Sequence, residues 1–102
     1  QKAKFFIHNK YYRPLTLKRI ADYVHLHPNY LCTLFREQTG LSVQQYLIRV
    51  RLDAADRHLS QGCSVQETAR LCGFADASNF SRLYKKHRGK SPAKNIEKGR
   101  CV

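Results

Sequence analysis

The stretch Ser64 to Arg88, SVQETARLCGFADASNFSRLYKKHR, contains two helical patterns on either side of a glycine. Ser64 followed three residues later by Glu67 is the pattern of a capping box, which predicts that a helix begins at the next residue. Gly73 supplies the left-handed backbone conformation that commonly ends a helix. The apolar residues on one face of this short first helix are Val65, Ala69 and Cys72.

The second half of the stretch predicts another helix, capped by Asp76 or Ser78. Its expected inward stripe is Phe80, Leu83, Tyr84 and His87. The other side begins with small polar residues and becomes basic, as a helix in the major groove of DNA requires. An ordinary solvated face has the same composition, so this stretch alone leaves both interpretations open. The outward or flanking residues are Ala77, Ser78, Asn79, Ser81, Arg82, Lys85 and Lys86.

The composition favours a polyanionic partner. Among 102 residues, Lys and Arg number 19 against 7 acidic residues, which gives a formal net charge of +12. Nucleic acid is the first candidate and an anionic membrane the second, although the sequence has no apolar run long enough to span a bilayer. The chain has no signal peptide and begins with Gln1, so we expect it to be part of a longer, cytoplasmic protein.

Cysteine and histidine positions predict neither a disulfide framework nor a metal site. There is no CxxC pair, and no His/Cys group recurs at zinc-finger spacing. Cys32 and Cys72 fall in helical segments rich in core residues, where a thiol acts as a small apolar group. We expect reduced thiols, no metal and no cofactor. The positions are Cys32, Cys63, Cys72 and Cys101, and His8, His25, His27, His58 and His87.

A second copy of the helix-turn-helix pattern begins at Thr16. Thr16 aligns with Ser64 at an offset of 48, and beyond the turn Leu31 aligns with Phe80 at an offset of 49. We expect the inserted residue to shift the start of the later helix, so that the two second helices do not expose equivalent positions. Further pairs are Ala21 with Ala69, Val24 with Cys72, Leu26 with Phe74, Leu34 with Leu83, Phe35 with Tyr84, Gly40 with Gly89 and Ser42 with Ser91.

Residues 2–12 precede the first copy and predict a packing helix that ends before Pro14. Its expected inward residues are Ala3, Phe6 and Ile7. Tyr11 and Tyr12 are expected to cover the core, and stacking on the bases of a single strand is the alternative.

Between the two copies, Ser42 and Gln45 form another capping-box pattern that opens a single helix of about 17 residues, roughly 25 Å long. We therefore expect three segments: an N-terminal helix-turn-helix lobe (1–41), a linking helix (42–61) and a C-terminal helix-turn-helix lobe (62–102). A link of this length favours two second helices in adjacent major-groove segments, about one turn or roughly 10 base pairs apart.

The stretch from Thr68 to Pro92, TARLCGFADASNFSRLYKKHRGKSP, resembles the signature of the AraC/XylS family of bacterial transcription regulators. The Gly-Phe turn, the Phe-Ser-Arg run, the basic pair and the closing Gly-x-Ser-Pro carry the resemblance, which extends back to Leu15. It implies an all-α, seven-helix domain of two helix-turn-helix lobes, C-terminal to an effector-binding or dimerisation domain and acting on promoter DNA. RNA polymerase is then a candidate partner.

The candidate DNA contacts lie off the inward stripes. In the helix starting at Pro28, the base-contacting candidates are Asn29, Cys32, Thr33 and Arg36, of which the first three match groove-facing positions of the family. In the second lobe they are Ala77, Ser78, Asn79 and Arg82. The phosphate-contacting candidates are Arg49, Lys85, Lys86, Arg88 and Lys90.

Other roles stay open for some of these residues. Plain solvent exposure is the alternative for the candidates on the first lobe. For Arg82 the alternatives are a phosphate contact or an ion pair with Asp76. For Arg51 the alternative is internal packing or pairing, because it lies on the Leu47 stripe.

Two other functions are weighed against a non-enzymatic regulator. A domain of this family can be fused to a DNA-repair alkyltransferase, which makes the DNA-binding part of such a fusion one alternative. A small helical RNA-binding module is the other, disfavoured because the aromatic residues lie in inward stripes. The sequence contains no nucleophile-base-acid set, no phosphate-binding glycine loop and no paired carboxylates, so we expect no catalysis.

Overall fold

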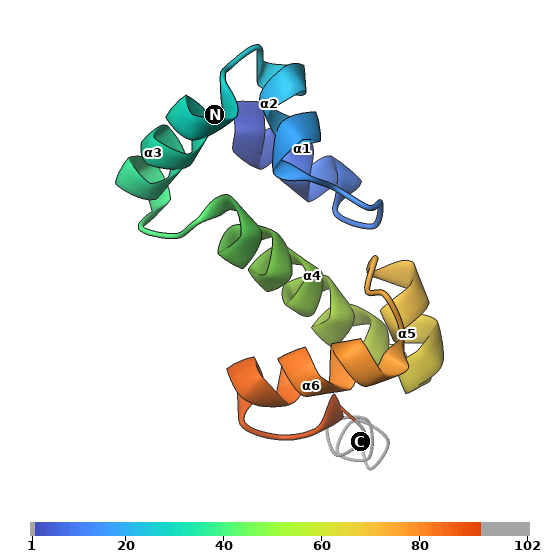
Figure 1. Cartoon of the computed structure of the whole chain (residues 1–102). Helices are drawn as coiled ribbons and strands as arrows, with labels where there is room; N and C mark the ends of the chain where they lie inside the picture. Colours follow the sequence, from blue (N-terminus) through green and yellow to red (C-terminus); the bar gives the residue numbers. More distant parts are fainter. Residues whose placement is uncertain (1, 93–102) are drawn as a thin grey trace. The chain divides into compact units, whose positions relative to one another are not determined.

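The computed structural model describes residues 2–92 of the chain. Within this range it contains six helices and no strand, as expected for an all-α chain (Figure 1). A seventh helix would fall in residues 93–102, which lie outside the described part together with Cys101. The helices are α1 (Lys2–Lys10), α2 (Leu17–Val24), α3 (Pro28–Thr39), α4 (Val43–Ser60), α5 (Val65–Leu71) and α6 (Ala77–Arg88).

The chain divides into two compact units, one up to Val50 and one from Arg51 onward. The division falls inside α4, whose first half packs in unit 1 and whose second half belongs to unit 2. No helix within residues 2–92 combines the length and the apolar character needed to cross a membrane.

Unit 1 is built on a core that α1, α2, α3 and the start of α4 share. Its buried residues are Ala3, Ile7, Ile20, Ala21, Leu31, Phe35, Val43, Leu47 and Val50. Phe35 packs edge-on against Tyr46, with 5.1 Å between ring centroids. Tyr11 is half-buried against this core as expected, but Tyr12 is 46% exposed, so the prediction that both tyrosines cover the core is wrong for Tyr12.

Unit 2 repeats this arrangement with α5 and α6 packed on each other. Phe80 is fully buried between Phe74 and Tyr84, at centroid distances of 4.8 and 5.6 Å. Cys72 is also fully buried, which confirms its predicted place in the core. The other buried residues of this unit up to Tyr84 are Leu52, Ala54, Ala55, Leu59, Thr68 and Ala69.

The predicted helix starts are confirmed by their hydrogen bonds. Thr16 accepts a bond from the amide of Arg19 at 3.1 Å, and Ser64 accepts the equivalent bond from Glu67 at 3.1 Å. The capping box of Ser42 and Gln45 is reciprocal, with bonds of 3.0 and 3.1 Å. At Ser64 only half of the predicted box is present, because the Glu67 carboxylate instead accepts a bond from Arg70 at 2.9 Å.

The two turns begin alike. The amide of Leu26 donates to the carbonyl of Ala21 at 3.0 Å, and that of Phe74 donates to Ala69 at 3.0 Å. The residue before each of these amide donors has a positive φ, which is 60° at His25 and 88° at Gly73.

The inserted residue lies between the helices and leaves α6 in register with α3. The N-caps are His27 and Asp76, and the left-handed C-caps are Gly40 and Gly89, each pair separated by 49 positions. Both helices have 12 residues. The expectation that they expose non-equivalent positions is therefore wrong. The extra residue, Ala75, lies in the turn before α6, so it does not change which positions of the helix face outward.

A polar cluster ties the end of α6 to α4 within unit 2. The hydroxyl of Tyr84 donates to Asp56 at 2.7 Å, and the guanidinium of Arg88 donates to Asp56 at 3.0 and 3.2 Å and to Asp53 at 2.9 Å. Burial lowers the pKa of Arg88, but the hydrogen bonds and charges of Asp56 and Asp53 raise it above its ordinary value. Arg88 is therefore a charged tether between the two helices.

We expect Asp56→Ala to lower the free energy of unfolding by about 1–2 kcal/mol, since it removes the partner of both Tyr84 and Arg88 at partly exposed positions. Asp53→Ala, which removes one bond from a more exposed carboxylate, is the matched control and should cost less than about 0.5 kcal/mol. Urea unfolding followed by circular dichroism measures both variants. Equal losses in the two variants would contradict the central role of Asp56.

Candidate nucleic-acid interface

The exposed face of α3 is set by the residues that the helix buries. Leu31 and Phe35 are 1% and 0% exposed and turn one side of the helix into the core of unit 1. The remaining side carries what we call the α3 face: Asn29, Cys32, Thr33 and Arg36, all exposed. Thr33 is exposed, and its hydroxyl donates to the carbonyl of Asn29 at 3.2 Å, which leaves the oxygen able to accept a further bond.

The sequence gives two conflicting predictions for Cys32: a buried core position and an exposed groove-facing position. It is exposed, so the prediction of a core thiol is wrong at this position. Its place beside Thr33 on the α3 face is the one that the groove-facing interpretation requires. The local pattern misleads because Cys32 is adjacent in sequence to the buried Leu31 but lies about 100° further round the helix.

The exposed face of α6 is fixed in the same way. Phe80 and Tyr84 are 0% and 1% exposed, which leaves Ser78, Arg82, Lys85 and Lys86 exposed on the opposite side. The first turn also presents the half-buried Ala77 and Asn79, and these six residues form what we call the α6 face. Asp76 caps the helix by accepting a bond from the amide of Asn79 at 2.7 Å and makes no ion pair with Arg82 among the described residues.

The last turn of α6 differs from its prediction. His87 is exposed, so its predicted inward position is wrong. Arg88 is the half-buried residue of this turn, because its guanidinium reaches the carboxylates of Asp53 and Asp56. A guanidinium held by two carboxylates is a poor phosphate ligand, so we do not place Arg88 in the interface.

The two faces occupy equivalent helical positions but differ in chemistry. With an offset of 49, Asn29 matches Ser78, Thr33 matches Arg82, and Arg36 matches Lys85. The first turn of each face is therefore short and polar, while the cations gather nearer the C-terminal end. Lys85 and Lys86 also lie in the last turn of α6, where positive charge is favourable to the helix dipole.

The other predicted cations lie outside these two faces. Arg49 is exposed on α4, and Lys90 is half-buried just beyond α6. Arg51 is half-buried, and burial lowers its pKa, which supports the packing role over a phosphate contact.

Sequence reasoning passed over two exposed side chains of α3. Tyr30 is 56% exposed beside Asn29, and Glu37 is exposed beside Arg36. A helical projection at 100° per residue places both at the edge of the outward side. Their spacing from the buried Leu31 and Phe35 could therefore have predicted their exposure.

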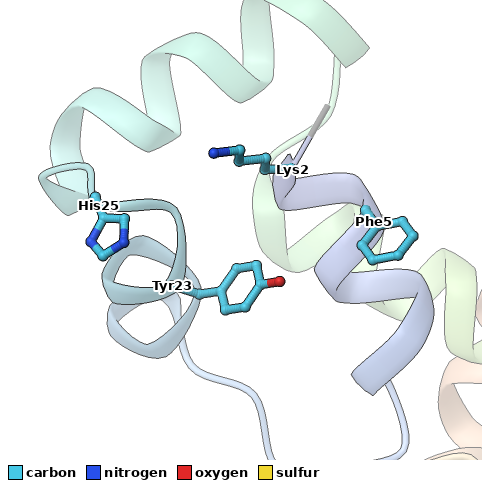
Figure 2. Close-up of a pocket in the computed structure, with 4 residues that line it drawn as sticks. All are labelled: Lys2, Phe5, Tyr23 and His25. Carbon is cyan, nitrogen blue, oxygen red and sulfur yellow. The ribbon is translucent and has the colours of Figure 1, made fainter.

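Metal-ligating and nucleophilic side chains also occur among the described residues. No group of three His, Cys, Asp or Glu side chains in residues 2–92 is arranged to hold a metal ion. Burial raises the pKa of the Cys72 thiol to about 11, so the reactive thiolate scarcely forms at neutral pH. A pocket of about 530 Å³ in unit 1 is lined by Lys2, Phe5, Tyr23 and His25, none of which belongs to the α3 face (Figure 2).

Comparison with known families and curated proteins gives the following matches. The chain matches the family described as "Helix-turn-helix domain" over residues 20–97. It is 34% identical to the Msm operon regulatory protein of Streptococcus mutans over 93 residues, which cover 90% of this chain and 34% of that protein. It is 31% identical to AdaA of Bacillus subtilis, named a bifunctional transcriptional activator and DNA repair enzyme, over 87% of this chain and 43% of that protein. The chain thus spans about a third of the length of its first curated relatives.

Solved structures give the same fold. A transcriptional regulator from Chromobacterium violaceum, described as containing an AraC-type DNA-binding domain, has a TM-score of 0.89 at 26% identity and covers 96% of this chain and 88% of that one. The DNA-binding domain of AdpA, a global transcriptional factor solved in complex with a target DNA, has a TM-score of 0.92 at 24% identity. It covers 97% of this chain and 90% of that one, and at this identity the likeness concerns the fold.

Proposed function

The chain belongs to the AraC/XylS family as a helix-turn-helix DNA-binding domain, and from this premise we propose that the α3 face and the α6 face read base edges in the major groove of double-stranded DNA. One observation carries the proposal. Two helices of 12 residues, with caps and buried residues at equivalent positions, each leave a polar face open that carries its positive charge toward the C-terminal end. A helix face that contacts only solvent would not require equivalent cap positions and the same charge distribution in both units.

Each face has groups suited to particular base edges. Asn29 carries an amide that pairs with the N6 and N7 atoms of adenine, and the methyl group of Thr33 fits the methyl group of thymine. Arg82 is exposed one turn inside α6 and is free of Asp76, so its guanidinium suits the O6 and N7 atoms of guanine. We assign supporting contacts to Cys32, Arg36, Ala77, Ser78 and Asn79.

Phosphate contacts are proposed for Lys85, Lys86, Lys90 and Arg49. The two lysines of α6 follow Arg82 along the helix, so a helix whose start reaches the bases carries them toward the sugar-phosphate backbone. Arg88 has the different role of tethering α6 to α4, which supports the orientation of the face without a phosphate contact.

We further propose that α4 links two DNA-reading units, since it is one helix of 18 residues that spans the division at Val50. In the longer protein an effector-binding or dimerisation domain precedes this chain, and RNA polymerase is a partner on promoter DNA in the cytoplasm. Residues 2–92 act without catalysis. Similarity to the bifunctional AdaA keeps a fused repair activity as the second candidate for the whole protein.

Base readout is tested by substituting one residue on each face. We expect Arg82→Ala to lose about 1–3 kcal/mol of discrimination at one base pair, because the bidentate contact to guanine is gone. Asn29→Ala and Thr33→Ala should relax the preference at a different position. Selection of duplexes from a random pool, followed by anisotropy titrations on the selected site and its single-base variants, measures both effects.

Arg70→Ala is the control for this experiment, since it removes one exposed positive charge from α5, outside both faces. It should leave the base preference unchanged. If Arg82→Ala and Arg70→Ala retain the same preference at every position, the assignment of base readout to the α6 face is wrong.

Phosphate contacts predict a specific dependence on salt. Each phosphate neutralised on duplex DNA contributes roughly 0.9 to the slope of log K against log salt concentration. The double variant Lys85→Ala/Lys86→Ala should therefore flatten the slope by up to about 1.8 and weaken binding to all sequences alike. Lys4→Ala removes one positive charge from α1, outside both faces, and should leave the slope within error. A loss confined to one sequence with an unchanged slope would contradict the phosphate role.

The link through α4 predicts the spacing of the subsites. Its 18 residues extend about 27 Å at 1.5 Å per residue, and we propose subsites about one turn of DNA, roughly 10 base pairs, apart. Five additional base pairs between the subsites should place one of them on the opposite side of the duplex and lower the affinity about tenfold or more. Footprinting that shows both subsites occupied at undiminished affinity after this insertion would rule out the proposed spacing.

A further inference from the structure

Unit 1 exposes an aromatic and cationic pocket that DNA reading does not use. Phe5 on α1 is 65% exposed and Tyr23 on α2 is 50% exposed, and together with Lys2 and His25 they line an open space of about 530 Å³. In Figure 2 the Tyr23 ring extends from α2 toward α1, and the Lys2 side chain points over the same space. Two large exposed aromatic residues that line one pocket on a small domain are typical of an interaction surface.

The Tyr23 wall of the pocket is held in place. Its ring stacks on Phe6 with 4.2 Å between centroids and an interplanar angle of 22°. Phe6 itself packs against the core of unit 1, so the position of the Tyr23 ring is coupled to that core. A ring that is fixed on one side and exposed on the other loses little freedom when a partner covers it.

His25 lines the same pocket from an unfavourable backbone conformation. It is the one non-glycine residue with a positive φ among the described residues, at φ 60° and ψ 41°. Gly73 occupies the equivalent place in unit 2, at an offset of 48, with a φ of 88°. Glycine adopts this conformation without steric cost, whereas histidine does not. His25 therefore keeps a side chain beside the pocket at a position where glycine would be free of strain.

The charges around the pocket select an acidic partner. Lys2 contributes an ammonium group, and α1 contains two more lysines, Lys4 and Lys10, and no acidic residue. Asp22 is exposed next to Tyr23 but does not line the pocket. A second copy of this chain would bring its own net charge of +12 against this surface and be repelled.

Duplex DNA and small molecules fit the pocket less well than a protein does. Phe5 has no polar atom with which to bind a phosphate or a base edge, and the bases of a duplex are already stacked. The pocket is also too open for a small ligand, because binding sites for such ligands bury most of the ligand surface and both aromatic walls here remain half exposed or more.

We propose that Lys2, Phe5, Tyr23 and His25 form a docking site for an acidic protein segment that inserts an aromatic or large aliphatic side chain into the pocket that they line. Carboxylates beside the inserted residue pair with Lys2 and contact His25. The site lies on α1 and α2, so it serves protein contact while the α3 face stays available for DNA.

A random peptide library selected against the full chain tests this site by letting the pocket choose its own ligands. Enriched peptides should combine an aromatic residue or Leu with neighbouring Asp or Glu. Synthetic copies of them should bind in anisotropy titrations, and Phe5→Ser and Lys2→Glu should each weaken them at least tenfold. Raised salt should weaken the wild-type complex. Enrichment of neutral or basic peptides only, or of none, would overturn the proposal.

Tyr12→Ser is the matched control, because Tyr12 is an exposed aromatic residue of unit 1 that does not line the pocket. It should leave peptide binding unchanged. Phe5→Ser should retain duplex DNA binding, which separates failure of this site from failure of DNA reading. Mutual exclusion of the peptide and duplex DNA would show that the pocket belongs to the DNA interface and would overturn the proposal.

His25→Gly tests the use of the strained residue. It should leave the melting temperature unchanged or raise it by a few degrees, because the left-handed conformation no longer carries a side chain. The same variant should bind the selected peptides at least threefold more weakly. Unchanged peptide affinity would show that His25 has no part in docking and would remove it from the site.

Discussion

The structure depends on the inability of its short helices to exist alone. Helix α2 has 8 residues and α5 has 7, well below the length at which a helix persists in water. Each is stabilised by two adjacent buried residues that pack in one core with the large apolar residues of the longer helix that follows. In unit 1 the pair is Ile20 and Ala21, against Leu31 and Phe35. In unit 2 it is Thr68 and Ala69, packed in the core that contains Phe80 and Tyr84.

Because the inward side of each longer helix is fully committed to this packing, the opposite side is left free in a fixed orientation. The ends of α3 and α6 are fixed as well, by an N-cap side chain at one end and a left-handed glycine at the other. Equivalent positions are therefore presented twice with different side chains. Thr33 and Arg82 occupy the same helical position, so one geometry presents a hydroxyl and a methyl group in unit 1 and a guanidinium in unit 2.

Sequence reasoning reached the features that local chemistry determines. Caps, helix ends, the repeat and the inward stripes depend on residues a few positions apart, and spacing alone separates Thr33 from the core. Residue type misleads for a thiol such as that of Cys32, because its apolar character suits the interior although the residue is exposed. The contact of Arg88 with Asp56 was not predicted, because the carboxylate lies 32 residues away on α4 and helical periodicity relates only residues within one helix. The pocket around Tyr23 and His25 was beyond prediction, since it joins α1 to the end of α2 through tertiary packing.

The basic character of the α6 face results from where the few acidic residues of unit 2 are used. Four of the 7 carboxylates have structural partners: Asp53 and Asp56 hold Arg88, Glu67 pairs with Arg70, and Asp76 caps α6. Arg82, Lys85 and Lys86 are exposed on α6 with no ion pair among the described residues. The acids thus orient the helix and leave the cations beside them available to a polyanion. In a chain of net charge +12, the acidic residues position α6 while its cations attract a polyanion, so both effects favour binding of the same ligand.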